Sequence, residues 1–541
     1  MRRILIVLAT ITMLMGSISV HAEQIAKTGG ILHLKIIDSE TGHEVPARIE
    51  VLDAAGESHF ADDALPIGGD CGLPDNENAP MQRPLKDALT KFTKTIQNPF
   101  TDAKHFYSAG QSTLKLPHGL FKIRVLKGPE YRLGKAEITI LPGKTTERTI
   151  KLRRFANMPA KGWYSADDHL HIARTNKGVD PLVSKMMQAE DIHVGNMLQM
   201  GRAHSFSITP QYAHGPESYY QEGNHIIATG QENLRTHILG HAITLGAKEP
   251  LRENDTYLLY RKFWKQAVDQ GGINGYAHYG ESLGRLASGL PLVAPHNLMS
   301  FMEVLQFNQG SYGAWYDLLN LGFRITPTAG TDYPCAGTRI PGQERFYTKV
   351  EGSFTYENWL DGVRKGRTFV TTGPLLKFRV NGKEVGDELI VPQAGEVTIE
   401  GEVLYDPEKS ILGENAGEGY ADPEKGYVVG LELIENGNVV RSFSRVDDSG
   451  KISFKIKHTI QETSWLALRT VDFRHFYATE RRLATAHSAP IYVTLKNASP
   501  LSAHPRTRAI SRAWLAALDG LEEKFTDKNI QYLANIDAGG D

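Results

Sequence analysis

Apolar and polar residues alternate through much of the first third of the chain, within residues 29–58, 112–125 and 136–152. A period of two is typical of strands that bury one face and expose the other. Turn-forming residues separate these strands, as in the Ser-Glu-Thr-Gly stretch at 39–42. We therefore predict a small antiparallel β-sandwich over residues 23–158, in which the Gly-, Pro- and Asp-rich stretch 67–99 is a long surface loop.

The pattern changes at about residue 159, where strands begin to alternate with helices. Apolar residues at helical spacing predict helices over residues 181–191, 254–270, 312–321 and 357–365. Short apolar runs between them predict strands that end near residues 278, 307 and 329. This rhythm is typical of a β/α barrel with a mostly parallel sheet, and we assign it to residues 159–374.

Short alternating segments return after the barrel and predict a second β-sandwich over residues 375–497. The predicted strands lie at 375–380, 396–404, 428–436, 452–457, 464–471 and 489–495. Residues 498–541 form a more polar tail in which Ala509–Phe525 has helical spacing. We expect this helix to pack on the body of a multidomain protein.

The first 22 residues have the three parts of a secretory signal peptide. A basic Met-Arg-Arg start precedes an apolar run over residues 4–15, and small residues at Val20 and Ala22 suit a cleavage site. The run falls short of the ~20 residues of a membrane span, which disfavours an anchor. We expect residues 1–22 to be removed, leaving a periplasmic or secreted protein with no membrane span.

Composition narrows the classes of partner. The chain has 60 basic and 62 acidic side chains and a formal net charge of −2. This balance gives no electrostatic footprint for nucleic acid, so we expect a small-molecule substrate and no nucleic-acid partner. Two cysteines, Cys71 and Cys335, exclude a disulfide framework, and whether they pair is left open.

The strongest chemical signal is the Asp-Asp-His-Leu-His stretch at residues 167–171. On a strand, residues two apart point to the same face, so His169 and His171 are expected side by side. Two imidazoles held together on a rigid strand make half of a metal site. The flanking carboxylates Asp167 and Asp168 strengthen this interpretation.

Four further candidates follow or end other predicted strands, where barrels gather their functional groups. Each has a plainer explanation when taken alone: a core histidine, a surface carboxylate or a turn cap. As a set with His169 and His171 they suit Zn²⁺, with Mn²⁺ or Fe²⁺ as alternatives, because imidazole and carboxylate are ligands of borderline softness. These candidates are Glu232, His241, His278 and Asp332.

The same residues, in the same order, resemble the motifs of the PHP superfamily of metal-dependent hydrolases. The matches are D-x-H-x-H at 167–171, G-x-E at 230–232, G-H-x-x-x-L-G at 240–246, A-H at 277–278 and G-[ST]-D at 330–332. Two later segments, R-T-F-V-T-x-G-P at 367–374 and A-H-[ST]-x-P at 486–490, resemble its CehA/McbA-like branch, which includes carbaryl hydrolases. Residues 35–51 resemble prealbumin-like, carboxypeptidase-regulatory modules.

The resemblance implies a distorted β/α barrel of PHP type and a role for each candidate. The implied metal ligands are His169, His171, Glu232, His278 and Asp332. His241 is then a further ligand or a residue that orients the substrate. Asp168 and His241 are the alternatives for proton transfer, and Glu303 is expected to brace the barrel floor or the ligands.

Two motif positions depart from the PHP pattern. The T-D-H position after the second strand reads Val-Gly-Asn-Met-Leu-Gln-Met at 194–200, and the final histidine of the late D-x-H motif is replaced by Pro334. We therefore expect one or two metal ions rather than the three that a complete PHP set binds.

The implied function is an exported metal-dependent hydrolase that directs a metal-bound hydroxide at an ester, carbamate or amide bond. A phosphoesterase is the alternative within the enzyme class, because many PHP members cleave phosphate esters. A non-catalytic ligand-binding protein on a decayed hydrolase scaffold is the alternative outside it.

Overall fold

The fold was obtained as a computed structural model that describes most of the chain between residues 29 and 524. The described ranges are 29–70, 91–97, 103–201, 207–236, 240–251, 260–278, 289–306, 309–334, 340–406, 428, 430–444, 449–471 and 484–524. The predicted signal peptide and the cysteines Cys71 and Cys335 lie outside these ranges.

The N-terminal unit is a sandwich of two sheets around one apolar core. One sheet has the order β10–β1–β7 and the other the order β5–β6–β2–β8–β9. The bounds are β1 Gly29–Asp38, β2 Ala47–Asp53, β5 Ile96–Gln97, β6 Lys104–Ser108, β7 Gln111–Pro117, β8 Gly119–Leu126, β9 Gly134–Ile140 and β10 Thr145–Leu152. Burial alternates along β1 and β9, as a period of two predicts.

Two details of the N-terminal unit differ from the prediction. β1 pairs with β10 in parallel, so the sandwich is not purely antiparallel. Within the predicted surface loop, β3 (Gly68–Asp70) pairs with β4 (Lys91–Thr93), and β5 joins the larger sheet through β6.

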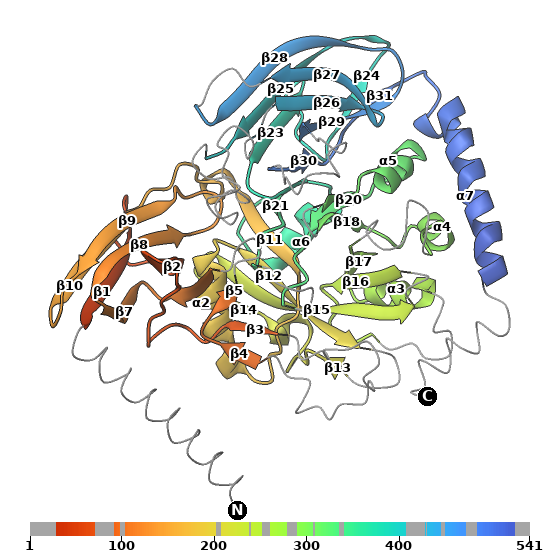
Figure 1. The fold of residues 1–541 in the computed structure, drawn as a ribbon. Coiled ribbons are helices and arrows are strands. Elements are labelled where there is room, and N and C mark those ends of the chain that lie inside the picture. Colours follow the sequence, from red (N-terminus) through yellow and green to blue (C-terminus); the bar gives the residue numbers. More distant parts are fainter. Residues whose placement is uncertain are drawn as a thin grey trace, which may run out of the picture.

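The central unit is a curled sheet whose strands are hydrogen-bonded in the order β11, β12, β15, β16, β17, β18 and β20 (Figure 1). Their bounds are β11 Trp163–Leu170, β12 Val194–Gly201, β15 His225–Thr236, β16 Gly240–Leu245, β17 Ile273–Tyr276, β18 Phe301–Gln306 and β20 Thr326–Ala329. Neighbours in this order are parallel except at β16, which is antiparallel to β15 and β17. The predicted parallel order is interrupted here because only residues 237–239 separate β15 from β16, too few for a crossover connection.

The curl brings the two ends of this strand order together. Leu170 at the end of β11 forms a parallel bridge with Tyr333, just beyond β20, and the His171 N–H donates to the Tyr333 carbonyl at 2.7 Å. The first half of β11 pairs instead with β21 (Arg345–Lys349), which in turn pairs in antiparallel direction with β22 (Thr368–Thr371). The short strands β13 (Ser207–Ile208), β14 (Tyr220–Glu222) and β19 (Gln309–Gly310) extend the edges.

Short helices accompany the curled sheet, and all of them except α4, which was not predicted, lie close to predicted positions. They are α2 Asp180–Ala189, α3 Tyr260–Asp269, α4 Leu290–Val293, α5 Gly313–Asn320 and α6 Tyr356–Arg364. Buried aromatic side chains such as Trp264, Trp315 and Trp359 fill the space between helices and sheet. The unit is therefore richer in strand, and poorer in helix, than a regular β/α barrel.

The C-terminal unit shares a sheet with the barrel. One layer has the order β23–β25–β28, and the other is joined to the barrel through the antiparallel pair β22–β30. The bounds are β23 Leu375–Val380, β24 Glu388–Val391, β25 Gly395–Leu404, β26 Gly430–Glu435, β27 Asn438–Ser444, β28 Lys451–Ile460, β29 Ser464–Thr470, β30 Ala486–Ser488 and β31 Ile491–Leu495. The two segments at 367–374 and 486–490 thus lie side by side at this junction.

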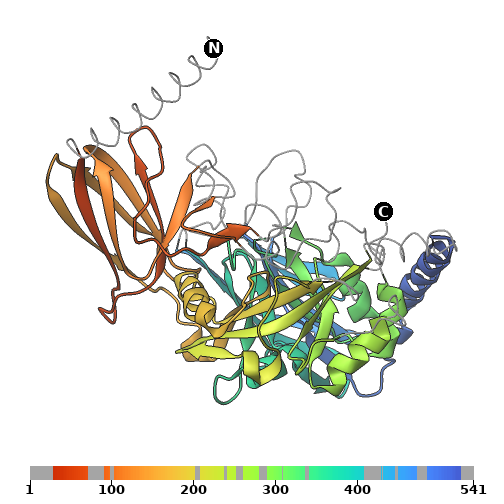
Figure 2. The same cartoon turned by 90° about the horizontal axis from the view of Figure 1, so that it is seen from below.

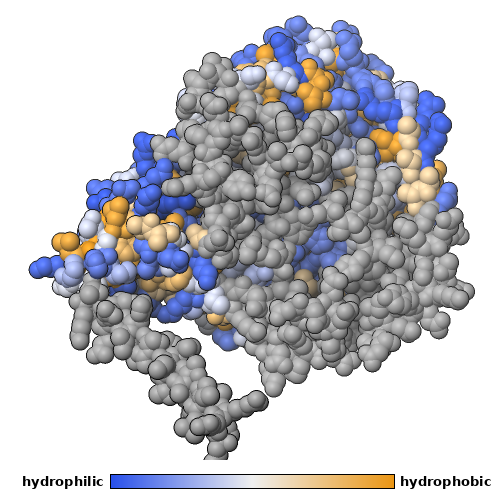
Figure 3. All heavy atoms as spheres, in the orientation of Figure 1, coloured by the Kyte–Doolittle hydropathy of each residue, from blue (hydrophilic) through white to orange (hydrophobic). Residues whose placement is uncertain are grey.

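The last helix, α7 (Pro505–Lys524), lies along the edge of the molecule opposite the N-terminal sandwich (Figure 2). Its Trp514 is buried in the same core as Trp264 and Trp315, as expected for a helix that packs on the body. Among the described residues, no helix combines the length and the apolar character that crossing a membrane requires. On the face shown in Figure 3, hydrophilic and hydrophobic side chains are intermingled over the described parts of both sandwiches.

Candidate metal centre

The two histidines of the 167–171 stretch face each other at the end of β11. Their Nε2 atoms are 3.0 Å apart, and both residues are fully buried. The two side chains share a site although the register of β11 against β12 shifts between Asp167 and Leu170. A shared cation is one arrangement that lets both of these nitrogens act as electron-pair donors at once.

Asp332 completes a first donor group with these histidines. It lies just after β20, and its Oδ1 is 3.1 Å from Nε2 of His171 and 3.6 Å from Nε2 of His169. Asp332 has a φ of 58°, and His278 across the site has a φ of 30°. Residues other than glycine adopt such angles at a cost, and strained residues of this kind cluster at functional sites.

Glu232, His241 and His278 form a second donor group. Nδ1 of His241 is 3.0 Å from Oε1 of Glu232 and 3.1 Å from Nε2 of His278. The distance from Nε2 of His278 to Oε1 of Glu232 is 3.5 Å.

The antiparallel direction of β16 explains how His241 reaches this group. His241 lies at the beginning of β16, beside the end of β17, and its carbonyl accepts from the Ala277 N–H at 3.1 Å. The sequence prediction placed Glu232 and His241 at strand ends. In the structure Glu232 lies within β15 and His241 near the start of its strand.

Glu232 connects the two donor groups. Its Oε2 lies 3.0 Å from Nε2 of His171 and 3.3 Å from Nε2 of His169, whereas its Oε1 faces His241 and His278. A carboxylate that offers one oxygen to each of two donor groups suits a bridge between two cations.

Charges in the site stabilise one another strongly. Burial alone lowers the pKa of His171, but hydrogen bonds to Asp332 and Glu232 outweigh this effect and raise it to about 9. Burial raises the pKa of Glu232, but the imidazole of His169 and hydrogen bonds from the neighbouring histidines bring it well below its ordinary value. The site therefore favours ionised carboxylates beside positive charge.

Glu303 on β18 orients residues of both groups. Its Oε1 is 3.0 Å from Nδ1 of His169, and its Oε2 accepts the backbone N–H of His278 at 2.5 Å. A carboxylate on the far nitrogen of a histidine directs the other nitrogen toward a metal. The sequence prediction left open whether Glu303 braces the barrel floor or the ligands, and its contacts with His169 and His278 correspond to the second alternative.

The two aspartates before His169 lie apart from both donor groups. Asp167 accepts from the hydroxyl of Thr331 at 2.6 Å and from the Gly342 N–H at 2.8 Å, so it ties together the loops around the site. Burial raises its pKa to about 6.

Asp168 is fully buried, and its carboxyl group lies beside the side chains of Thr328 and Glu303. Burial and the nearby charge of Glu303 raise its pKa well above the ordinary value. A Cβ added at Gly330 would lie 2.7 Å from both Asp168 Oδ1 and Glu303 Oε1, so only glycine fits between these carboxyl groups. The assignment of Asp168 or His241 to proton transfer stays a prediction.

The two departures from the PHP pattern have structural counterparts. β12 carries Asn196 where an acidic or imidazole ligand was expected, and its Oδ1 accepts from the Tyr356 hydroxyl at 2.5 Å. Beyond Asp332 the chain continues through Tyr333 to Pro334, which offers no ligand. The donors that do converge, imidazole nitrogens with carboxylate oxygens, fit divalent transition metals.

Comparisons with known proteins give only slight likenesses. No protein-family model matches the sequence, and no curated protein matches it. A two-domain protein from Bacteroides vulgatus ATCC 8482, containing a predicted PHP-like metal-dependent phosphoesterase, is similar over 60% of this chain and 95% of its own, with 10% identity and a TM-score of 0.31.

Two other solved structures are more distant still. A lesion-specific endonuclease from Pyrococcus furiosus is similar over 38% of this chain and 56% of its own, with 12% identity and a TM-score of 0.24. The minor pilin GBS52 of Streptococcus agalactiae is similar over 24% of this chain and 46% of its own, with 16% identity and a TM-score of 0.15.

TM-scores this low do not show a shared fold or activity. An Endonuclease Q structure with the same TM-score of 0.24 contains duplex DNA with an abasic lesion. Because a likeness this slight carries no argument about the present chain, the expectation that nucleic acid is not a partner stays a prediction. Membership of the PHP superfamily, and of its CehA/McbA-like branch, likewise stays a resemblance carried by the motifs.

Proposed function

We propose that this chain is a metal-dependent hydrolase that binds two divalent cations, one at each donor group. The observation that supports this most directly is Glu232, whose two oxygens face different groups. A divalent cation bound there supplies Lewis acidity, which polarises a scissile carbonyl or phosphoryl group and makes water a better nucleophile near neutral pH.

The exposure of the ligands indicates where a substrate approaches. The side chains of His241, Asp332 and His278 are 14, 13 and 12% exposed, whereas His169, His171 and Glu232 are 0–1% exposed. Substrate therefore reaches the site from the side of the first three residues. His241, the most exposed of them, combines the roles of ligand and substrate contact, and Glu303 holds His169 in place from behind.

The charge around the site depends on the cations it holds. Five buried or nearly buried carboxyl groups accompany the four imidazoles: Asp167, Asp168, Glu232, Glu303 and Asp332. Two divalent cations would offset much of this negative charge. Because residues 367–374 and 486–490 resemble the branch that includes carbaryl hydrolases, we propose hydrolysis of a carboxylic ester, carbamate or amide, with a phosphate ester as the alternative. The side chains of Arg202 and Arg235, the nearest basic candidates by sequence, lie outside the described residues.

Metal analysis tests the centre. We expect purified protein to hold about two equivalents of Zn²⁺, Mn²⁺ or Fe²⁺, one per donor group, and a His171→Ala variant to hold less. Retention of less than one equivalent of any tightly bound metal would contradict the proposal. Thermal unfolding of the variant in chelator, compared with wild type in chelator, separates loss of metal from loss of fold.

A substrate panel tests the reaction. We expect chelator-sensitive hydrolysis of 4-nitrophenyl acetate, 1-naphthyl N-methylcarbamate or an anilide, and slower hydrolysis of 4-nitrophenyl phosphate and bis(4-nitrophenyl) phosphate. Faster cleavage of the phosphate compounds would favour the phosphoesterase. A protein that holds its metals but hydrolyses none of these substrates would favour the non-catalytic scaffold.

We also propose that the protein is exported, on the strength of residues 1–22 alone. Expression with these residues should yield a periplasmic or secreted chain that begins at Glu23. Mass spectrometry of the N-terminus checks this expectation, and a cytoplasmic chain that keeps residues 1–22 would contradict it.

A further inference from the structure

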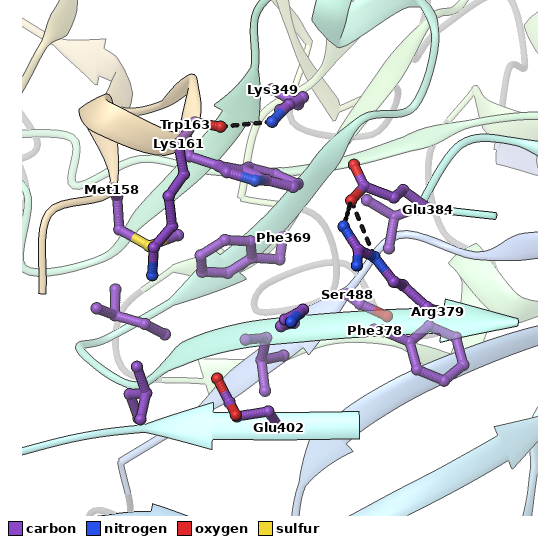
Figure 4. A pocket seen from close by; sticks show the side chains of 15 residues that line it. Met158, Lys161, Trp163, Lys349, Phe369, Phe378, Arg379, Glu384, Glu402 and Ser488 are labelled. Atoms are coloured by element: carbon purple, nitrogen blue, oxygen red, sulfur yellow. Dashed lines mark hydrogen bonds and ion pairs between the residues drawn. The ribbon is translucent and has the colours of Figure 1, made fainter. Parts of the chain in front are cut away.

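A cavity of about 230 Å³ lies at the junction of the barrel and the C-terminal sandwich (Figure 4). β11, β21 and β22 of the barrel and β23, β25 and β30 of the sandwich contribute to its wall. The segments 367–374 and 486–490 supply Phe369 and Ser488. The proposed hydrolase uses neither segment at its metal centre.

The cavity is well separated from the candidate metal centre. Trp163 in its wall begins β11, and His169 lies six residues further along the same strand. At roughly 3.3 Å per residue these positions are about 20 Å apart. A ligand in the cavity therefore does not contact the metal ligands.

Much of the cavity wall is apolar and aromatic. The rings of Trp163 and Phe369 lie side by side, with centroids 5.4 Å apart. Met158, Leu376 and Phe378 are buried side chains that extend this surface. Such a wall suits a flat apolar group, since aromatic rings pack well against one another in offset or edge arrangements.

The rim of the cavity carries excess positive charge. Its two carboxylates are already paired, Glu384 with Arg379 and Glu402 with Lys451. Lys161, Lys349 and Lys377 also line the cavity, and none of them pairs with a carboxylate among the described residues. Lys349 instead donates to the carbonyl of Lys161 and lies 5.9 Å from the centroid of the Trp163 ring.

We propose that this cavity is a second ligand site, for a small organic anion with a flat apolar body. The apolar wall takes the body, and the lysine ammonium groups at the rim take a carboxylate. The volume admits a compound of one or two fused rings, because it falls just below the usual range of drug-sized pockets, about 300–1,000 Å³. The charge on the rim selects the anion over neutral or cationic compounds of the same shape.

Calorimetric titration with three compounds of one shape tests the charge preference. The probes are 2-naphthoate, 2-naphthamide and 2-naphthylmethylamine, titrated into the full-length protein. We expect 2-naphthoate to bind at least about tenfold more tightly than the other two, because the lysines at the rim attract its charge. Equal affinity for the three compounds, or no detectable binding of 2-naphthoate, would overturn the proposal.

Variants of the lining residues test whether 2-naphthoate binds in the cavity. Lys161→Glu combined with Lys377→Glu should weaken 2-naphthoate at least about tenfold by reversing the charge of the rim. Leu404→Trp should abolish binding by filling the cavity, and it keeps the test valid if the double variant unfolds. Lys151→Glu reverses the charge of an exposed lysine on β10, outside the cavity, and this control variant should bind 2-naphthoate normally.

The metal centre is the competing place for a carboxylate. A His171→Ala variant should bind 2-naphthoate as wild type does, because the cavity lies at the other end of β11. Binding that is lost in His171→Ala but kept in the lysine and Leu404→Trp variants would assign 2-naphthoate to the metal centre and overturn the proposal.

Discussion

Two buried clusters of charged side chains in this protein are built on opposite plans. At the junction of the N-terminal sandwich and the barrel, each acid pairs with a cation. Arg48 is 2.6 Å from Glu190, and Arg154 is 2.7 Å from Glu130 and 2.9 Å from Asp191. At the metal centre, imidazole nitrogens and carboxylate oxygens converge instead, with two imidazole nitrogens only 3.0 Å apart.

The difference separates structural from functional charge. The junction acids also accept from neutral donors: the Tyr107 hydroxyl donates to Glu190 at 2.8 Å, and the Tyr347 hydroxyl donates to Glu130 at 3.0 Å. Such a network fixes the position of the sandwich against the barrel. The donors of the metal centre form a set that a cation completes. Substitution of these donors should therefore affect metal binding and activity more than folding.

The largest expected effect is on activity. Replacing both His169 and His171 with alanine should remove the first donor group and reduce metal-dependent hydrolysis by about a thousandfold or more, because the cation that lowers the barrier is lost. Metal content and initial rates measure this effect. Activity within tenfold of wild type would show that these imidazoles are not the functional ligands.

The junction should respond in the opposite way. Arg48→Ala leaves Glu190 buried without its cation, and we expect the free energy of unfolding to fall by about 3–5 kcal/mol. Metal content per folded molecule should stay unchanged. Denaturant unfolding measures the first quantity, and the control is Arg48→Met with Glu190→Leu, which removes both charges and should restore much of the stability. Loss of bound metal in folded Arg48→Ala would contradict the view that the junction cluster is structural and only the metal centre is functional.

Glu303 should behave as a positioning residue of the metal centre. Glu303→Gln keeps the size of the side chain but weakens its hold on Nδ1 of His169, and we expect metal affinity to fall by about 10- to 100-fold. Competition with a chelator of known affinity measures the change. The fold should persist, and an unchanged metal affinity would make Glu303 a purely structural residue.

The last expected effect concerns the pH dependence of the metal-free protein. The pKa of His171 is raised from 6.5 to about 9 in the folded state. A raised pKa contributes stability that is complete below pH 6.5 and is lost as pH rises through about 9. We expect the metal-free protein to lose on the order of 3 kcal/mol over this window, at about 1.4 kcal/mol per pH unit. Unfolding in chelator at several pH values measures the loss, which His171→Gln should reduce.

The metal-loaded protein provides the contrast for the pH experiment. A bound cation replaces the proton on His171, so the loaded protein should not show the same loss between pH 6.5 and 9. Equal pH dependence with and without metal would mean that His171 does not exchange a proton for a metal.

Local patterns predicted much of the fold because they depend on neighbouring residues. The alternation in Gly29–Asp38 became a strand with alternating burial, and the helix predicted over 357–365 became α6, Tyr356–Arg364. The parallel pairing of β1 with β10 could not be predicted, because it joins segments that lie more than a hundred residues apart. The direction of β16 depended on the short connection 237–239. The alternation of apolar and polar residues predicts a strand but not the direction in which it runs.

The sequence by itself determined the chemistry of the candidate site: the residue types, their order, and the pairing of His169 with His171 through the period of a strand. Only the tertiary structure decided that Glu232 divides its oxygens between two donor groups, that His241 joins the second group, and that Glu303 supports both. The physical reason is distance along the chain. Six side chains from five strands and their ends meet only when the sheet curls, and that curl results from pairing and packing across the whole barrel.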